Sequence, residues 1–277
     1  MMKEKKRLDI ILTERGLFPS REKARAAIMA GEVLVNDQKI DKAGAAVDTK
    51  CQIRLLGEKL PYVSRGGLKL AKAISSFGID MQNKIVLDIG ASTGGFVDCS
   101  LQNGAQKVYA VDVGYNQLAW RLRNDPRVVV MEKTNARYLD ATAIPEMVDM
   151  LTADVSFISL TLVLPSSVQH LLKPGGEVAA LIKPQFEAGR EAVGKGGIVR
   201  DKLTHKAVIE KVLAAFCQWG LGVRGLDFSP ITGMDGNIEY LVYAVKGGEN
   251  RQFAVDDIID KAHEHHKKKA VHKGENQ

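Results

Sequence analysis

The sequence is poor in cysteine, and its cysteines are widely spaced. Cys51, Cys99 and Cys217 are odd in number and lack the paired spacing of a zinc site. They predict no disulfide framework and fit a reducing compartment. Long apolar runs are also missing, because no segment approaches the roughly 20 apolar residues that a membrane-spanning helix needs. We therefore expect a cytoplasmic protein that is neither secreted nor embedded in a membrane.

Aromatic residues are scarce as well, at 6% of the chain, and they show no spacing that exceeds what a core requires. The hydrophobic share of 45% and the charged share of 26% are instead typical of a globular protein. A length of 277 residues suits one domain of ordinary size together with a smaller one.

Positive charge exceeds negative charge, with 39 Lys and Arg against 33 Asp and Glu and a formal net charge of +6. This excess favours a polyanionic partner through counterion release. The basic residues gather near both ends of the chain, at Lys3, Lys5, Lys6, Arg7, Arg21, Lys23 and Arg25, and again at Lys267, Lys268, Lys269 and Lys273.

The first 60 residues predict a small α+β domain. Apolar residues recur at helical spacing in two stretches of residues 7–29, and Phe18-Pro19-Ser20 separates them. Ser20 is a good N-cap and Gly31 a good stop signal, so the second helix is expected over Arg21–Ala30. Short strands are expected at Val33–Val35 and Ile53–Leu56.

Residues 61–65 predict a linker, because Pro61 begins the segment and paired glycines follow it. Beyond it, over residues 66–247, strand-length apolar runs alternate with helical segments, which predicts an α/β, Rossmann-like domain with a mostly parallel sheet. The expected strands are Ile85–Ile89, Lys107–Val111, Val128–Met131, Met150–Ala153, Glu177–Ile182, Leu226–Phe228 and Tyr240–Val245. The last two strands are expected to form an antiparallel edge hairpin. Residues 248–277 predict a charged tail, frayed or with a short helix around Phe253–Ala262.

A glycine-rich turn follows the first of these strands and predicts a nucleoside-cofactor site. Gly90 allows close approach of a ligand to the backbone, and Gly94 with Gly95 allows a tight turn. Asp112, 24 residues after Asp88, has the position of a carboxylate that binds ribose hydroxyls. Ser92 replaces the middle glycine of a dinucleotide motif, so a nicotinamide enzyme is the weaker interpretation. The candidate cofactor residues are Asp88, Gly90, Ser92, Thr93, Gly94, Asp112 and Asn135, the last of which could instead cap a helix.

Four ionisable residues fall at the ends of expected elements: Lys69, Asp154, Lys183 and Glu239. In an open α/β sheet, chemistry gathers at the carboxyl ends of the strands, so Asp154 and Lys183 are expected beside the cofactor. Taken singly, Lys69 and Glu239 would more often be solvated surface charges.

Five stretches of the chain together resemble a known family, the TlyA hemolysin-like rRNA methyltransferases. That family joins an N-terminal S-four RNA-binding domain to an FtsJ-like catalytic domain. The matching stretches are Ser20-Arg21-Glu22-Lys23-Ala24-Arg25, Ser64-Arg65-Gly66-Gly67-Leu68-Lys69, Asp88-Ile89-Gly90-Ala91-Ser92-Thr93-Gly94-Gly95-Phe96, Asp154-Val155-Ser156-Phe157 and Ile182-Lys183-Pro184-Gln185-Phe186-Glu187.

The resemblance implies S-adenosylmethionine as cofactor and a ribose 2′-hydroxyl of ribosomal RNA, in a cytidine, as substrate. It implies a catalytic tetrad at Lys69, Asp154, Lys183 and Glu239. Within this tetrad, Lys183 is our candidate for the residue that contacts the hydroxyl. Whether Lys183 is the general base or an ammonium that stabilises the oxyanion stays open. The implied RNA-binding residues are Arg7, Ser20, Arg21, Lys23, Arg25 and Arg65.

Two other interpretations of the function remain. A non-catalytic RNA-binding assembly factor would share the fold but would not bind the cofactor. A pore-forming hemolysin would need apolar or amphipathic barrel segments, for which the sequence gives no support. His263, His265 and His266 near the C-terminus lack Cys or carboxylate partners in a folded frame, so no metal site is expected.

Overall fold

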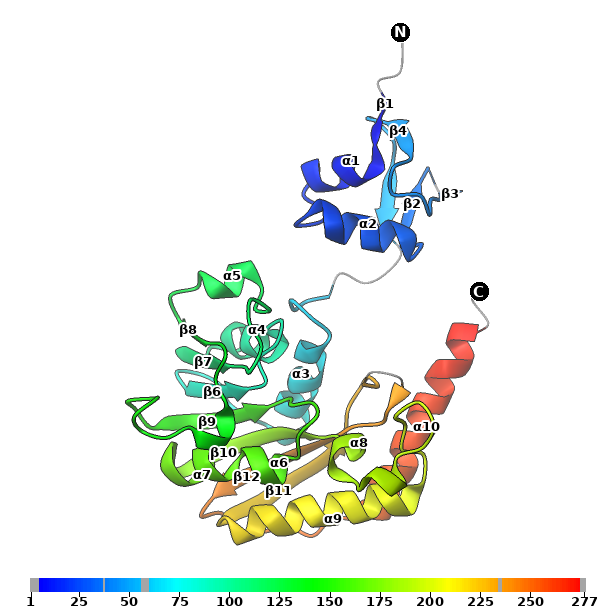
Figure 1. Cartoon of the computed structure of the whole chain (residues 1–277). Coiled ribbons are helices and arrows are strands. Elements are labelled where there is room, and N and C mark those ends of the chain that lie inside the picture. The colour runs from blue at the N-terminus through cyan, green and yellow to red at the C-terminus, as the bar shows by residue number, and fades with distance from the viewer. Residues whose placement is uncertain (1–4, 37, 56–59, 234–235, 275–277) are drawn as a thin grey trace. The chain divides into compact units, whose positions relative to one another are not determined.

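The computed structural model describes residues 5–36, 38–55, 60–233 and 236–274 (Figure 1). The chain divides into two compact units, Met1–Lys59 and Leu60–Gln277. All three cysteines are free thiols.

The first unit is small and has its own apolar core, built mainly from Leu8, Leu12, Ala24, Ile28 and Val33. Its elements are β1 (Lys5–Arg7), α1 (Leu8–Glu14), α2 (Arg21–Met29), β2 (Val33–Val35), β3 (Gln38–Lys39), β4 (Ala46–Asp48) and β5 (Ile53–Leu55). Strand β1 pairs with β4, and β2 pairs with both β3 and β5, all antiparallel. The Ser20 hydroxyl accepts a hydrogen bond from the Lys23 amide, so the predicted N-cap of α2 is confirmed. Strands β1, β3 and β4 were not predicted, because two or three residues carry no readable alternation.

The second unit holds a seven-stranded sheet in the order β11-β12-β10-β9-β6-β7-β8. Its strands are β6 (Ile85–Ile89), β7 (Lys107–Val111), β8 (Val128–Met131), β9 (Val148–Ala153), β10 (Leu172–Ile182), β11 (Leu221–Phe228) and β12 (Tyr240–Lys246). Its helices are α3 (Gly66–Phe77), α4 (Gly95–Gln102), α5 (Trp120–Arg123), α6 (Leu160–Val163), α7 (Pro165–His170), α8 (Pro184–Glu187), α9 (Lys202–Gln218) and α10 (Val255–Gly274), with 3-10 turns η1 (Ala136–Tyr138) and η2 (Arg190–Ala192).

Strands β6 to β10 run parallel to one another, and β12 runs antiparallel to both β10 and β11. The predicted Rossmann-like sheet and its edge hairpin are therefore confirmed. Strand β11 begins five residues earlier than predicted, because glycines at 222 and 225 break its apolar pattern. Helices α3 and α4 cover one face of the sheet, and α7 and α9 cover the other (Figure 1). The strand order reverses between β6 and β9, which is where such folds bind ligands.

The prediction that residues 61–65 form a linker is wrong. The Val63 amide donates a hydrogen bond of 2.7 Å to Asp98 on α4, and the Gln102 side chain donates one of 3.0 Å to the Pro61 carbonyl. Tyr62 and Val63 pack against the core of the second unit. Asp98 is buried and also binds Arg121 of α5, so its carboxylate joins the entry segment to two helices.

The predicted charged tail is also wrong in part, because α10 extends from Val255 to Gly274 and packs against the core of the second unit, of which it is a part. Ile259 and Ala262 are buried in the core. The outer face carries ion pairs of 2.6 Å with α9, from Asp256 to Lys206 and from Asp260 to Lys202. The many charges of this helix hid the narrow apolar stripe by which it packs. Within the described part of the chain, no helix is long and apolar enough to cross a membrane.

The packing of α10 predicts that Ile259→Ala lowers the free energy of unfolding by about 2–4 kcal/mol, since it removes a core side chain and leaves a cavity. Lys261→Ala, on the exposed face of the same helix, is the control and should change it by less than about 0.5 kcal/mol. Chemical denaturation of the full chain measures both. Equal stability of the two variants would mean that α10 contributes nothing to the fold.

Candidate active site

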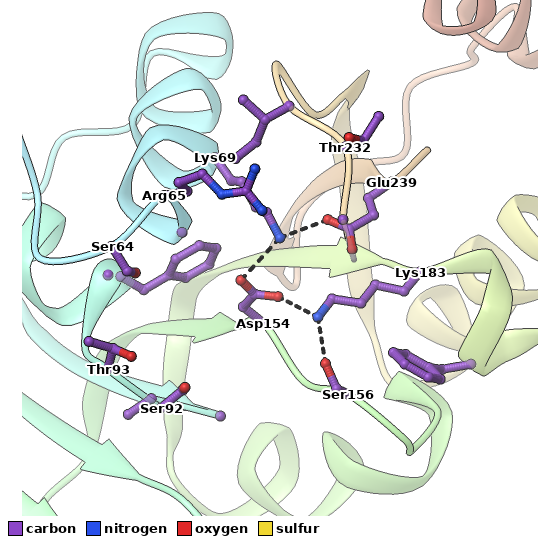
Figure 2. Close-up of a pocket in the computed structure, with 18 of the residues that line it drawn as sticks. Ser64, Arg65, Lys69, Ser92, Thr93, Asp154, Ser156, Lys183, Thr232 and Glu239 are labelled. Carbon is purple, nitrogen blue, oxygen red and sulfur yellow. Dashed lines mark hydrogen bonds and ion pairs between the residues drawn. The ribbon is translucent and has the colours of Figure 1, made fainter. Parts of the chain in front are cut away.

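The four ionisable residues predicted as catalytic converge on one cavity (Figure 2). Lys69 lies in the first turn of α3, and Asp154 directly follows β9. Lys183 directly follows β10, where Pro184 begins α8 and turns the chain. Glu239 precedes β12, whose first residue, Tyr240, pairs with Ile182 of β10. This register explains why two residues 56 positions apart in the sequence meet at one end of the sheet.

The four side chains form an alternating row of charges. The Lys69 Nζ lies 2.7 Å from the Glu239 Oε2 and 3.4 Å from the Asp154 Oδ2. The other oxygen of Asp154, Oδ1, lies 2.7 Å from the Lys183 Nζ. Asp154 is therefore shared by the two lysines, and the row has no net charge.

The row is largely withdrawn from solvent, with exposures of 8% for Lys69, 7% for Lys183 and 1% for Glu239. Burial lowers the pKa of Lys69, but Asp154 and Glu239 outweigh this, and the pKa lies above its ordinary value. Burial raises the pKa of Asp154, but Lys69 and Lys183 outweigh it, and the pKa lies below its ordinary value. Lys69 and Asp154 therefore remain an ion pair at neutral pH.

Ser156 is part of the same site although it was not predicted. Its hydroxyl accepts a hydrogen bond of 2.9 Å from the Lys183 Nζ, so Asp154 and Ser156 together orient that ammonium. At the other end of the row, a Cβ on Gly233 would lie 2.2 Å from the Glu239 Oε1. Only glycine at this position leaves room for the Glu239 carboxylate. Ser156 lies two residues after Asp154 in the same motif. A hydroxyl so close to a candidate catalytic carboxylate was the signal that could have identified it.

The cavity that holds the row has a volume of about 420 Å³. Arg65, which was predicted to bind RNA, lines it together with Ser64, Thr93 and Thr232. The cavity thus combines a charged row with hydroxyl groups, which suits a polar substrate group.

The turn between β6 and α4 borders this cavity. Gly90 has a φ of +85°, and a Cβ on it would lie 2.9 Å from the Asp154 carbonyl oxygen. Gly94 has a φ of +97°, and its Cβ would lie 2.4 Å from the Leu122 side chain, so it packs the turn rather than lining a cavity. Gly90 therefore brings the cofactor turn against the strand end that carries Asp154.

A second cavity of about 380 Å³ adjoins the first, and Gly90, Ser92, Asp154 and Ser156 line both. The Asp112 carboxylate lies in its wall and accepts hydrogen bonds of 2.7 Å from the Ser92 and Gly114 amides. Asn135 also lines it, while its side chain accepts from the Arg137 amide and caps η1. The size, the fixed carboxylate and apolar wall residues such as Val155 and Ile158 suit a nucleoside.

Asp88 does not lie where it was predicted, because it is 1% exposed and lines neither cavity. Its Oδ1 accepts a hydrogen bond of 2.7 Å from the Thr152 hydroxyl of β9. Burial raises its pKa to about 7, Thr152 opposes the rise, and Asp154 and Asp112 add to it. The residue therefore supports the sheet beneath the cofactor turn.

Two aromatic rings beside the cavities were not predicted. Phe157 has a φ of +64° and is 85% exposed, which is unusual for a large apolar side chain. Its ring centre lies 4.9 Å from that of Phe186 on α8. Phe157 lines the second cavity and Phe186 the first, so the pair stands at the junction of the two.

The other residues predicted to bind RNA lie in the first unit. Lys23 and Arg25 are exposed on α2, whereas the Ser20 hydroxyl is used in the helix cap. Arg21 does not project freely beside Arg25 as expected, because it is ion-paired with Asp9, which also binds Arg7.

The three histidines near the C-terminus lie on α10. The ring of His263 contacts that of His205 on α9, and His265 and His266 contact Phe228.

Comparison with known proteins gives two family matches. Residues 62–246 match the FtsJ-like methyltransferases, and residues 6–52 match the S4 domain. The chain is 51% identical to "Putative rRNA methyltransferase YqxC" of Bacillus subtilis, over 96% of each chain. It is 40% identical to "16S/23S rRNA (cytidine-2'-O)-methyltransferase TlyA" of Mycobacterium tuberculosis, over 95% of this chain and 97% of that protein. A solved structure, "Putative hemolysin from Streptococcus thermophilus", is 46% identical with a TM-score of 0.77, covering 98% of this chain and 100% of that one.

The buried Asp88 predicts a specific pH dependence of stability. Between pH about 4 and about 7 the folded protein holds a proton on Asp88 that the unfolded chain releases, so this group destabilises the fold as pH rises through that window. Asp88→Asn should keep the Thr152 hydrogen bond and remove an effect of about 4 kcal/mol in full, of which about 2–3 kcal/mol develops between pH 5 and pH 8. Thermal unfolding near pH 5 and near pH 8 should therefore show the variant gaining stability over the wild type at the higher pH. A constant difference between the two proteins would contradict the protonated state.

Proposed function

The chain belongs to the FtsJ-like methyltransferase family, and on that premise we propose that it methylates a ribose 2′-hydroxyl of ribosomal RNA with S-adenosylmethionine as the donor. The observation that carries the proposal is the neutral Glu239–Lys69–Asp154–Lys183 row in a cavity that adjoins a nucleoside-sized one. We take cytidine as the target nucleotide because the relative from Mycobacterium tuberculosis is named for it.

The second cavity is the proposed cofactor site. Asp112 would bind ribose hydroxyls of the cofactor, because two backbone amides already hold its carboxylate in one orientation. The apolar wall at Val155 and Ile158 would cover the adenine, and the open backbone at Gly90 would allow close approach. When bound, S-adenosylmethionine supplies an electrophilic methyl group on its sulfonium.

Lys183 is the residue that we propose to contact the substrate hydroxyl. An ammonium has three N–H donors; that of Lys183 donates one hydrogen bond to Ser156 and forms an ion pair with Asp154. A further N–H is then available to the 2′-oxygen, which the ammonium would orient and whose developing negative charge it would stabilise. The hydroxyl proton would pass to solvent, and the cofactor, whose carbon–sulfur bond to the methyl group would break, would leave as a neutral thioether.

Lys69 and Glu239 would hold the rest of the row in place. Lys69 is the second cation paired with Asp154, and Glu239 balances the charge of Lys69. A fixed arrangement matters because methyl transfer requires the oxygen in line with the breaking bond, and positioning supplies much of such catalysis.

The exposed ring of Phe157 is a further argument for an RNA substrate. A ribose inside a cavity requires its base to leave the surrounding stack, and RNA-binding proteins commonly stack such bases on aromatic rings. The Phe157 and Phe186 pair offers a ring at the junction of the two cavities. The exposed arginines of the S4 domain would hold the RNA through contacts to its phosphate backbone.

For the cofactor site, Asp112→Asn should weaken S-adenosylmethionine binding by about 1.5–3 kcal/mol, since charged hydrogen bonds to the ribose are lost. Asn preserves the shape of the side chain and one acceptor for the turn. Calorimetric titration with the cofactor measures the change, and Asp140→Asn, on an exposed turn of the same unit, is the control. Unchanged affinity in Asp112→Asn would remove Asp112 from the cofactor site.

For the catalytic role, Lys183→Ala should reduce methyl transfer by at least about 100-fold, because the donor to the oxyanion is lost. Cofactor affinity should change little. Lys173→Ala, which removes a half-exposed lysine from β10, the strand that Lys183 follows, is the matched control. Transfer of a tritiated methyl group to ribosomal RNA is the measurement, and activity retained in Lys183→Ala would exclude the mechanism described above.

A further inference from the structure

Asp9 is a fully buried carboxylate in the small first unit, and its side chain is 0% exposed. It lies in the first turn of α1 between Leu8 and the core-facing Ile11. Two hydrogen bonds fix the backbone around it. The Leu8 amide donates one of 2.9 Å to the Ala45 carbonyl, and the Asp9 amide donates one of 3.3 Å to the Ala43 carbonyl. A buried charge of this kind persists only where it is paired.

Two arginines provide the pairing. Arg7 donates from both Nε and Nη2, each at 3.0 Å, to the two oxygens of Asp9. Arg21 on α2 donates from Nη2 at 3.1 Å to Oδ2, which is also the oxygen that Arg7 Nη2 contacts. The hydrogen bond from Arg7 lowers the pKa of Asp9 to about 2, against the opposing effect of burial and with help from Arg21. Asp9 is therefore charged under all ordinary conditions.

The two guanidinium groups face solvent although their partner does not. The Arg7 and Arg21 side chains are 49% and 54% exposed. Each guanidinium has five N–H donors, of which Arg7 uses two on Asp9 and Arg21 uses one. The remaining donors are free of Asp9, and the two groups are held side by side because they share one oxygen.

We propose that Asp9 is a positioning residue that holds Arg7 and Arg21 together as a clamp for one phosphodiester of the RNA. The proposal rests on the proposed function, because it takes RNA as the ligand. Two arginines and one carboxylate carry a net single positive charge, which one phosphate neutralises. Arginine forks match phosphate oxygens, and a side chain fixed before binding loses less entropy when the ligand arrives.

This role makes a prediction opposite to that of simple electrostatics. Asp9→Asn makes the protein more positive by one charge, so unspecific attraction would strengthen RNA binding. The clamp instead requires binding to weaken, on the order of fivefold, since two arginines must now be ordered by the RNA itself. Glu14→Gln is the matched control. It removes the same charge from the same helix, where Glu14 pairs with the half-exposed Lys6 and touches neither arginine of the clamp.

The experiment is filter binding of the full-length variants to purified ribosomal RNA at one salt concentration. Asp9→Asn should bind more weakly than the wild type, and Glu14→Gln as tightly or more tightly. In the Arg7→Ala, Arg21→Ala background, the Asp9→Asn substitution should cause no further loss of binding, because Asp9 acts only through the arginines. A loss that persists in that background indicates a merely structural role and overturns the proposal. Unchanged or tighter binding of Asp9→Asn also overturns it.

A second variant keeps the test independent of the folding of Asp9→Asn. Arg7→Lys with Arg21→Lys preserves both charges and leaves Asp9 in place but removes the fork geometry. The clamp predicts weaker RNA binding, whereas equal binding contradicts it. If Arg7→Ala with Arg21→Ala binds RNA like the wild type, the clamp is excluded while the methyl transfer proposed for the second unit stands. Absence of methyl transfer by the wild type would refute the proposed function alone.

Discussion

The pairing of Asp154 with two lysines is the interaction on which the site depends. Lys69 and Lys183 are both withdrawn from water, and neither would be stable as a lone buried cation. One carboxylate between them, with Glu239 beyond Lys69, allows both to stay inside the cavity. Removal of any member would leave an uncompensated buried charge, which costs far more than the pair contributes to stability. Stability alone therefore does not explain the row. Its role is in the proposed reaction, and the fold has to hold the four side chains in place.

The sheet provides that support through its strand ends. Parallel strands β9 and β10 deliver Asp154 and Lys183 to the same edge, and the antiparallel β12 returns Glu239 to it. Gly90 lets the cofactor turn approach the carbonyl group of Asp154, so the proposed cofactor and substrate cavities share a wall. Asp154 thus belongs to the charged row, contacts the cofactor turn and lines both cavities.

The sequence predicted those features that follow from periodicity and strand ends, namely the parallel sheet and the positions of Asp154 and Lys183. It predicted less well wherever the outcome depends on which side of an element faces the cavity. Asp88 lies in the cofactor motif but points into the sheet toward Thr152, and the motif alone does not give that direction. The charged surface of α10 hid its apolar stripe. The sequence also did not show that residues 61–65 pack against the second unit, because Asp98, the partner of Val63, is distant in sequence. Asp9 escaped notice because a single acid among basic residues resembles a solvated charge.

The central claim is that the charged row directs a methyl group to a ribose oxygen and not to a base. The most direct measurement is to incubate the protein with unmodified ribosomal subunits and with S-adenosylmethionine that carries an isotopic label in its methyl group. The RNA is then hydrolysed with alkali, and the labelled products are identified by mass. A 2′-O-methyl group removes the nucleophile of alkaline cleavage, so the account predicts that the label is recovered in an alkali-resistant dinucleotide whose 5′ residue is cytidine. Recovery of the label in a methylated base within mononucleotides would contradict it.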